Sequence, residues 1–189
     1  PYQYGANNPI LYIDVNGDSL RISYKGNDIL YDSGKLYDSN GNTYKGEGAK
    51  LDKNGNVKKY KGFLKQTVAT LGKIGNTSEG GALISELQNS TNNFTISHAS
   101  NNPDKNKTQF VPNSIVKGYA NQIRNDPKYA NLLQGGMNLN GGSGGTVYWN
   151  PSGTVIPTTA GPQANPLMDL AHEMFHGLDA NRGLLDDRA

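Results

Sequence analysis

The clearest pattern of apolar and polar positions lies between Asn165 and Gly183. Apolar side chains recur there at helical spacing and form one face of an amphipathic helix, namely Leu167, Leu170, Ala171, Met174 and Leu178. Asn165 is a good N-cap, Pro166 suits the first helical position, and Gly183 is a plausible end. At about 100° per residue, His172 and His176 fall on the side opposite the apolar face. The pattern therefore predicts a helix that turns two imidazoles away from the core.

Strand-like alternation dominates residues 19–62, where Leu20, Ile22 and Tyr24 alternate with polar residues. Asn-Gly pairs further along mark turns, so this stretch predicts hairpins. The abundant tyrosines leave two interpretations open. They form either a ligand-stacking surface or ordinary cross-strand packing, which is the commoner use.

Residues 63–91 have helical spacing, and residues 94–98 predict a short strand that ends at His98. His98 is either a further metal ligand or acid, or a plain polar residue at a strand end. Residues 99–113 are polar and rich in Asn and Lys, so they predict a loop. An interrupted helix is predicted after Ile115.

A glycine-rich run, residues 135–145, precedes the last predicted strand and lacks the lysine and spacing of a phosphate-binding loop. We expect this run to be a mobile segment that borders a cleft. The strand at residues 146–150 holds Tyr148 and the only tryptophan, Trp149. It is either a free edge that pairs with an extended substrate chain or an internal strand with both rings in packing.

These elements predict an α+β fold: a small twisted sheet packed on the C-terminal helix and one or two others, with an N-terminal β-hairpin extension. A length of 189 residues suits one domain, or one domain with a small appendage. The hydrophobic fraction of 34% and the 24 glycines indicate a chain rich in turns, and not a helical bundle.

Charge and cysteine content narrow the possible functions. A net charge of +2 gives no indication of a nucleic-acid surface. The sequence has no apolar run long enough to span a bilayer. The absence of cysteine excludes a thiolate zinc site and any disulfide.

The polar side of the predicted helix reads His172-Glu173-Met174-Phe175-His176, an H-E-x-x-H pattern. Histidines one turn apart point the same way and can both bind Zn²⁺, while the glutamate between them can act as general base on a water. The spacing therefore predicts His172 and His176 as metal ligands and Glu173 as the catalytic residue. The alternative is a chance match on an ordinary amphipathic helix.

The third zinc ligand is open, because catalytic zinc sites usually have three protein ligands. Asp179 lies on nearly the same helical face, where it would bind the ion or orient a histidine. Asp186 and Asp187 follow the predicted helix end, where the chain can fold back, and a residue beyond Ala189 is a further candidate. The oxyanion donor is also unidentified, with Tyr148 one candidate.

The first residues resemble the end of the core domain in RHS (YD-repeat) proteins, where a YxYxxNNPxxYxDxxGD-like segment closes the conserved shell. The matching residues are Tyr4, Gly5, Asn7, Asn8, Pro9, Ile10, Tyr12, Asp14, Gly17 and Asp18. Val15 stands where a proline is usual. The resemblance implies that a variable C-terminal domain follows, often a toxin or effector enzyme. A surface hairpin is the alternative, since Asn16 and Gly17 form a turn signal.

The HEMFHG helix and the GSGGTVYWNP segment before it resemble the zincin metalloproteases that serve as bacterial effectors and RHS-linked toxins. The likeness spans roughly residues 70–189 and is carried by Gly142, Ser143, Gly144, Val147, Pro151, Leu170, Ala171, His172, Glu173 and His176. It implies a zinc-dependent endopeptidase whose third ligand is acidic and lies on a later helix. That helix would follow Ala189, and this fragment alone would then be inactive.

We therefore expect the tail of an RHS core segment at residues 1–18, a hairpin-rich extension at 19–62, and a zincin-like metallopeptidase domain at 63–189 that is truncated at its C-terminus. The expected partners are a protein or peptide substrate, an RHS shell and a cognate immunity protein. We expect a bacterial chain that is secreted or delivered at a cell surface as part of a longer protein. Two rivals stay open: a zinc amidase or deacylase, and a non-catalytic β-rich interaction module with a vestigial or structural metal site.

Overall fold

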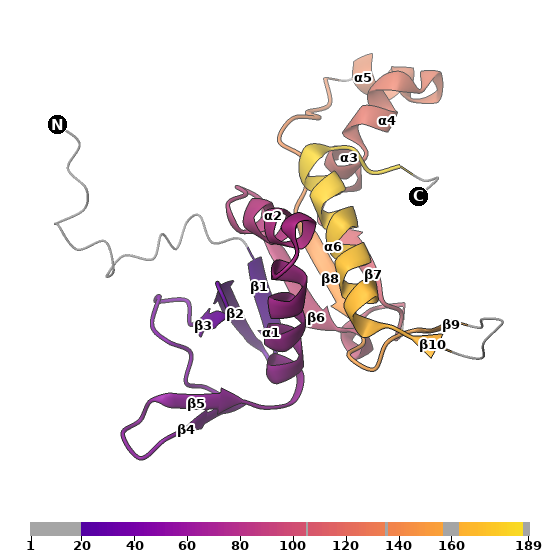
Figure 1. Cartoon of the computed structure of the whole chain (residues 1–189). Helices are drawn as coiled ribbons and strands as arrows, with labels where there is room; N and C mark the ends of the chain where they lie inside the picture. The colour runs from indigo at the N-terminus through magenta and orange to yellow at the C-terminus, as the bar shows by residue number, and fades with distance from the viewer. Residues whose placement is uncertain (1–19, 105, 135, 157–162, 187–189) are drawn as a thin grey trace, which may run out of the picture.

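A computed structural model describes residues 20–104, 106–134, 136–156 and 163–186 (Figure 1). Its centre is a six-stranded sheet in the order β3-β2-β1-β6-β8-β7. The strands are β1 (Leu20–Tyr24), β2 (Asn27–Asp32), β3 (Lys35–Tyr37), β6 (Phe94–His98), β7 (Gln109–Pro112) and β8 (Gly145–Trp149). Strands β1, β6 and β8 run parallel, whereas the other pairs are antiparallel. The sheet is therefore mixed, with β3 and β7 at its edges.

Two tight turns build the β1–β2–β3 meander. Lys25 and Gly26 join the first pair, and Ser33 and Gly34 join the second, all with positive φ. Positive φ at both central residues is the type I′ geometry, whose twist matches that of paired strands. The strands of the hairpins predicted for this part of the sequence therefore belong to the six-stranded sheet.

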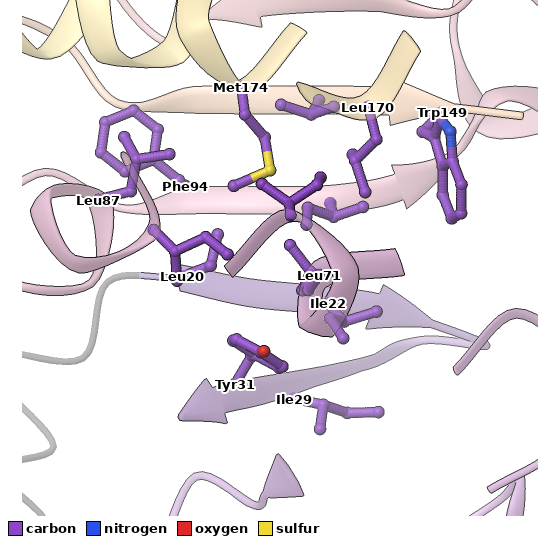
Figure 2. Close-up of a cluster of buried hydrophobic side chains, with 14 of the residues drawn as sticks. Leu20, Ile22, Ile29, Tyr31, Leu71, Leu87, Phe94, Trp149, Leu170 and Met174 are labelled. Atoms are coloured by element: carbon purple, nitrogen blue, oxygen red, sulfur yellow. The ribbon is translucent and has the colours of Figure 1, made fainter. Parts of the chain in front are cut away.

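Three helices cover one face of the sheet: α1 (Gly62–Gly75), α2 (Ser78–Gln88) and α6 (Pro166–Arg182) (Figure 1). Figure 2 shows side chains of these helices meeting those of the strands in a single core. The core includes Leu71 of α1, Leu87 of α2 and Met174 of α6. Strand positions that alternate with the core residues, such as Arg21 and Thr146, are only half-buried. The apolar stripe of α6 therefore packs on the one face of the sheet that carries the core.

Smaller elements surround this core. Two short hairpins are formed by β4 (Ala49–Leu51) with β5 (Val57–Tyr60) and by β9 (Val155–Ile156) with β10 (Gln163–Ala164). Short helical turns are η2 (Ala99–Asn101), α3 (Ile115–Gly118), α4 (Ala120–Asn125), η3 (Pro127–Tyr129) and α5 (Ala130–Gln134). A second apolar cluster contains Ala120, Ile123 and Leu139, with Tyr119 and Tyr129 packed against it. This cluster holds α3, α4 and η3 together near the C-terminal end of α6 (Figure 1).

The predicted α+β fold, a small sheet packed on helices, is confirmed. The division of the chain at residues 18 and 62 stays a prediction, and the RHS-like residues 1–18 lie outside the described residues. Tyr31 and Tyr44 are buried in the core, which supports packing as the role of these hairpin tyrosines. Within the described ranges, no helix combines the length and apolar character needed to cross a bilayer.

One local expectation was wrong, and one of two open alternatives is excluded. The polar stretch 99–113, predicted to be a loop, contains edge strand β7. The strand at 146–150, considered as a free edge, is β8 and lies between β6 and β7. Trp149 is 1% exposed, and its indole N–H donates to the Pro166 carbonyl at 2.8 Å. The packing interpretation therefore holds for Trp149, which anchors the first turn of α6.

Candidate active site

Helix α6 forms as its sequence predicts. The Asn165 side chain accepts the N–H of Met168 at 3.2 Å, and Pro166 occupies the first turn. Gly183 ends the helix in the left-handed conformation, with φ of 70°. Its N–H donates to the Ala180 carbonyl, while the N–H of Leu184 donates to that of Asp179. These capping bonds satisfy backbone groups that a helix end leaves unpaired.

The two histidines of α6 converge. Their Nε2 atoms lie 3.1 Å apart, and the ring planes meet at 85°. At zinc–nitrogen distances of about 2.0–2.1 Å, nitrogens at that 3.1 Å separation subtend about 100° at a shared ion, close to tetrahedral. His172 is exposed and His176 is half-buried, so an ion has access from solvent. The imidazole pair therefore fits two positions of a zinc site.

Glu173 is held by the edge of the sheet. The backbone N–H of Phe110 in β7 donates to Glu173 Oε2 at 2.6 Å. Phe110 pairs with Val147 across the antiparallel ladder, and the N–H of Asn113 donates to the Gly144 carbonyl. Backbone groups that bond to the neighbouring strand alternate with groups that do not, so the backbone groups of Phe110 and Pro112 point away from β8. The outer edge of β7 thus orients the predicted base.

A cleft of about 360 Å³ opens beside Glu173 and His176. Its other lining residues are Gln109, Phe110, Pro112, Tyr119, Leu185 and Asp186. After Gly183 the chain folds back, because the N–H of Leu185 donates to the Gly118 carbonyl at 3.0 Å and Leu185 is buried. This return carries Asp186 into the cleft. The cleft therefore brings the carboxylates of Glu173 and Asp186, the imidazole of His176 and the side chain of Tyr119 to the free edge of the sheet.

The last four residues of the glycine-rich run are packed, contrary to the expectation of a mobile segment, whereas Gly136 and Gly141 are exposed. Residues 142–145 are buried, and the N–H of Ser143 donates to the Ala180 carbonyl at 2.8 Å. A Cβ on Gly142 would lie 1.8 Å from the Asn181 carbonyl oxygen, and a Cβ on Gly145 would lie 2.4 Å from the Phe110 ring. Glycine is required because this segment passes so close to α6 and β7. The run therefore fixes the C-terminal half of α6 against the sheet.

The other predicted ligands are not assembled around the two imidazoles. Within the described residues, no group of three or more His, Asp or Glu side chains could hold one ion. Among the described residues, Asp179 makes no hydrogen bond to the imidazole of His172 or of His176. His98 lies at the end of β6, where its Nδ1 accepts the Ser100 N–H at 3.1 Å. Asp187 is outside the described residues.

Tyr119 was not predicted from the sequence as a site residue, whereas Tyr148 was considered. Tyr148 is not among the described residues that line the cleft, and Tyr119 is. Tyr119 follows α3 in a segment whose pattern indicated only a broken helix. No local motif marks it, because its place in the cleft depends on the packing of α3 against α6.

Comparison with known proteins shows the family to which the chain belongs. The sequence matches the model of a peptidase family described as an effector protein family, over residues 52–189. The chain is thus an effector peptidase, and it belongs to the Peptidase M91 family. No curated protein and no solved structure matches the chain. The predictions of a peptidase, of an effector and of a protein substrate are confirmed at this level.

Proposed function

We propose that this chain is a zinc-dependent endopeptidase, with His172 and His176 as metal ligands and Glu173 as general base. The observation that carries the proposal is the convergence of the two Nε2 atoms, 3.1 Å apart, beside a glutamate that faces a cleft. The family match supports the reaction class.

Bound zinc would supply a Lewis acid for the scissile carbonyl and lower the pKa of the attacking water. Glu173 accepts a proton from that water and returns it to the leaving amine. Because the Phe110 N–H donates to Oε2, the oxygen left for the proton transfer is Oε1. Fixing one oxygen restricts the rotation of the carboxylate and orients the base before the substrate arrives.

We propose Asp186 as the third ligand, which requires the return after Gly183 to bring its carboxylate closer to the two imidazoles, and Tyr119 as the oxyanion donor. Both line the cleft that contains Glu173 and His176. A carboxylate is a common third ligand of catalytic zinc, and a phenol can donate to a developing oxyanion. Asp179, Asp187 and a residue beyond Ala189 are the alternatives for the ligand.

The substrate backbone adds to the outer edge of β7 in this proposal. Phe110 and Pro112 both face outward, but the N–H of Phe110 is bound to Glu173 and Pro112 has none. Only their carbonyl oxygens remain for a substrate, so the substrate chain must supply the N–H donors. Addition of an extended chain to a sheet edge is a general mode of peptide recognition.

The resemblance of residues 4–18 to an RHS core segment supports a C-terminal effector or toxin domain of an RHS-family protein. We propose delivery of the bacterial chain by secretion or at the cell surface, with an RHS shell and a cognate immunity protein as partners.

Glu173→Gln tests the mechanism. This variant keeps the size of the side chain and its acceptor for the Phe110 N–H, but it removes the base. We expect cleavage of an unfolded protein to fall by about 10²–10⁴ with bound zinc unchanged. Retained cleavage would refute the role of Glu173. Small amides measured in parallel separate a peptidase from an amidase or deacylase.

A further inference from the structure

A second hollow continues from the cleft along β7. Its volume is about 490 Å³, and it shares Gln109, Phe110, Pro112 and Tyr119 with the cleft. Further walls come from α3 and α4, where Ile115, Val116 and Ile123 face it. We call this hollow the β7–α4 groove. The groove and the cleft are continuous, so one extended chain on β7 passes both.

The chemistry of the groove is apolar. None of its lining residues carries a charge, and Ile123 belongs to the second apolar cluster. At the rim, the Ile115 side chain is 69% exposed, the most exposed of the large apolar residues described. Such a site accepts apolar or aromatic groups, and it penalises a charged group because burial without a partner is costly.

We propose that the β7–α4 groove is a substrate subsite that selects an apolar or aromatic side chain close to the scissile bond. The inference rests on the proposed endopeptidase function and extends it to the substrate class. Side chains of an extended chain alternate, so every second one, about 6.6–6.8 Å further along, points the same way. A substrate paired with β7 therefore places one side chain in the groove while its neighbouring peptide bond lies in the cleft.

Ile115 offers a clean test, because its exposure allows substitution without opening the core. The zinc-loaded chain is incubated with a proteome-derived peptide library, and the residues around each cleavage site are counted. We expect Phe, Tyr, Leu, Ile or Met to be enriched at one position within about three residues of the cut. Ile115→Asp should remove this enrichment in favour of Lys and Arg, and Ile115→Lys should favour Asp and Glu.

Leu51→Asp is the matched control, since Leu51 is 41% exposed on the remote strand β4 and its replacement should leave the profile unchanged. On a peptide with Phe at the selected position, Ile115→Asp should lower kcat/KM about tenfold or more. Absence of apolar enrichment in the wild-type chain, or one profile shared by both Ile115 variants, would overturn the subsite.

Peptide binding separates this inference from the endopeptidase proposal. The Glu173→Gln chain is titrated with two fluorescent peptides that differ only in Phe or Asp at a central position. Tighter binding of the Phe peptide, lost in the double variant with Ile115→Asp, supports the groove even if the wild-type chain cleaves nothing. Equal binding of both peptides refutes the groove, and cleavage by the wild-type chain would then still support the endopeptidase.

Discussion

Substitutions at two neighbouring glycines, Gly141 and Gly142, test whether the glycine segment packs directly against α6. Gly141 and Gly142 both have positive φ, at 85° and 60°. Nothing lies within 4 Å of a Cβ on Gly141, whereas a Cβ on Gly142 would lie 1.8 Å from the Asn181 carbonyl oxygen. Alanine at either position adopts the same strained backbone, but only alanine at position 142 collides with α6. The pair therefore isolates the close approach from the backbone effect.

The expected magnitudes follow from these contacts. Gly141→Ala should cost about 1–2 kcal/mol, the usual penalty for left-handed backbone outside glycine. Gly142→Ala adds about 1–3 kcal/mol for the forced displacement. Displacement also endangers the bond from the Ser143 N–H to the Ala180 carbonyl, 2.8 Å long, for about 1 kcal/mol more. We therefore expect a difference of about 2–4 kcal/mol between the variants.

Urea unfolding, followed by circular dichroism and by the fluorescence of Trp149, measures this difference as a shift in midpoint at a constant slope. A loss of this size is a large part of the free energy of unfolding of a domain. Equal midpoints for the two variants would refute the packed arrangement and restore a loose glycine segment beside the cleft.

Three further substitutions test the site and its support. Asp186→Asn should raise the zinc dissociation constant about tenfold or more in a competition with a chelator, and an unchanged value would exclude Asp186 as the third ligand. Tyr119→Phe should lower kcat about a hundredfold with KM and bound zinc unchanged, and an unaltered kcat would exclude its hydroxyl as the oxyanion donor. Trp149→Phe removes the donor to the Pro166 carbonyl and should reduce the free energy of unfolding by about 1–3 kcal/mol. An unchanged unfolding midpoint would show that this hydrogen bond does not contribute to stability.

The features that could be predicted from the sequence are those that depend on residues close together along the chain. The caps of α6, its apolar stripe and the i, i+4 pair of histidines are all written within residues 165–183. Helical geometry alone brings His172 and His176 to the same side, so no tertiary information was needed. The glycines of Asn40-Gly41 and Asn54-Gly55, predicted as turns, likewise have positive φ, whereas no turn was predicted at Ser33-Gly34.

The missed parts depend on contacts between distant segments. Strand β7 has only four residues and lies in a stretch that is polar for most of its length, and nothing in residues 99–113 shows that Phe110 would meet Glu173, 63 positions later. The glycine run resembled a flexible loop because composition reports conformational freedom but not close approach. Tyr119 reaches the cleft only because α3 packs against α6 beside the returning chain at Leu185.

The bond between the Phe110 N–H and Glu173 links substrate recognition to the proposed catalysis. A free sheet edge normally offers both donors and acceptors, and it attracts other strands without discrimination. Here Pro112 has no N–H, and Glu173 already accepts the N–H of Phe110. The edge is thus left with acceptors alone, which weakens accidental strand pairing and favours chains whose N–H groups fall opposite these carbonyls. Because the same bond fixes the base, a shift of β7 alters substrate binding and the position of Glu173 together.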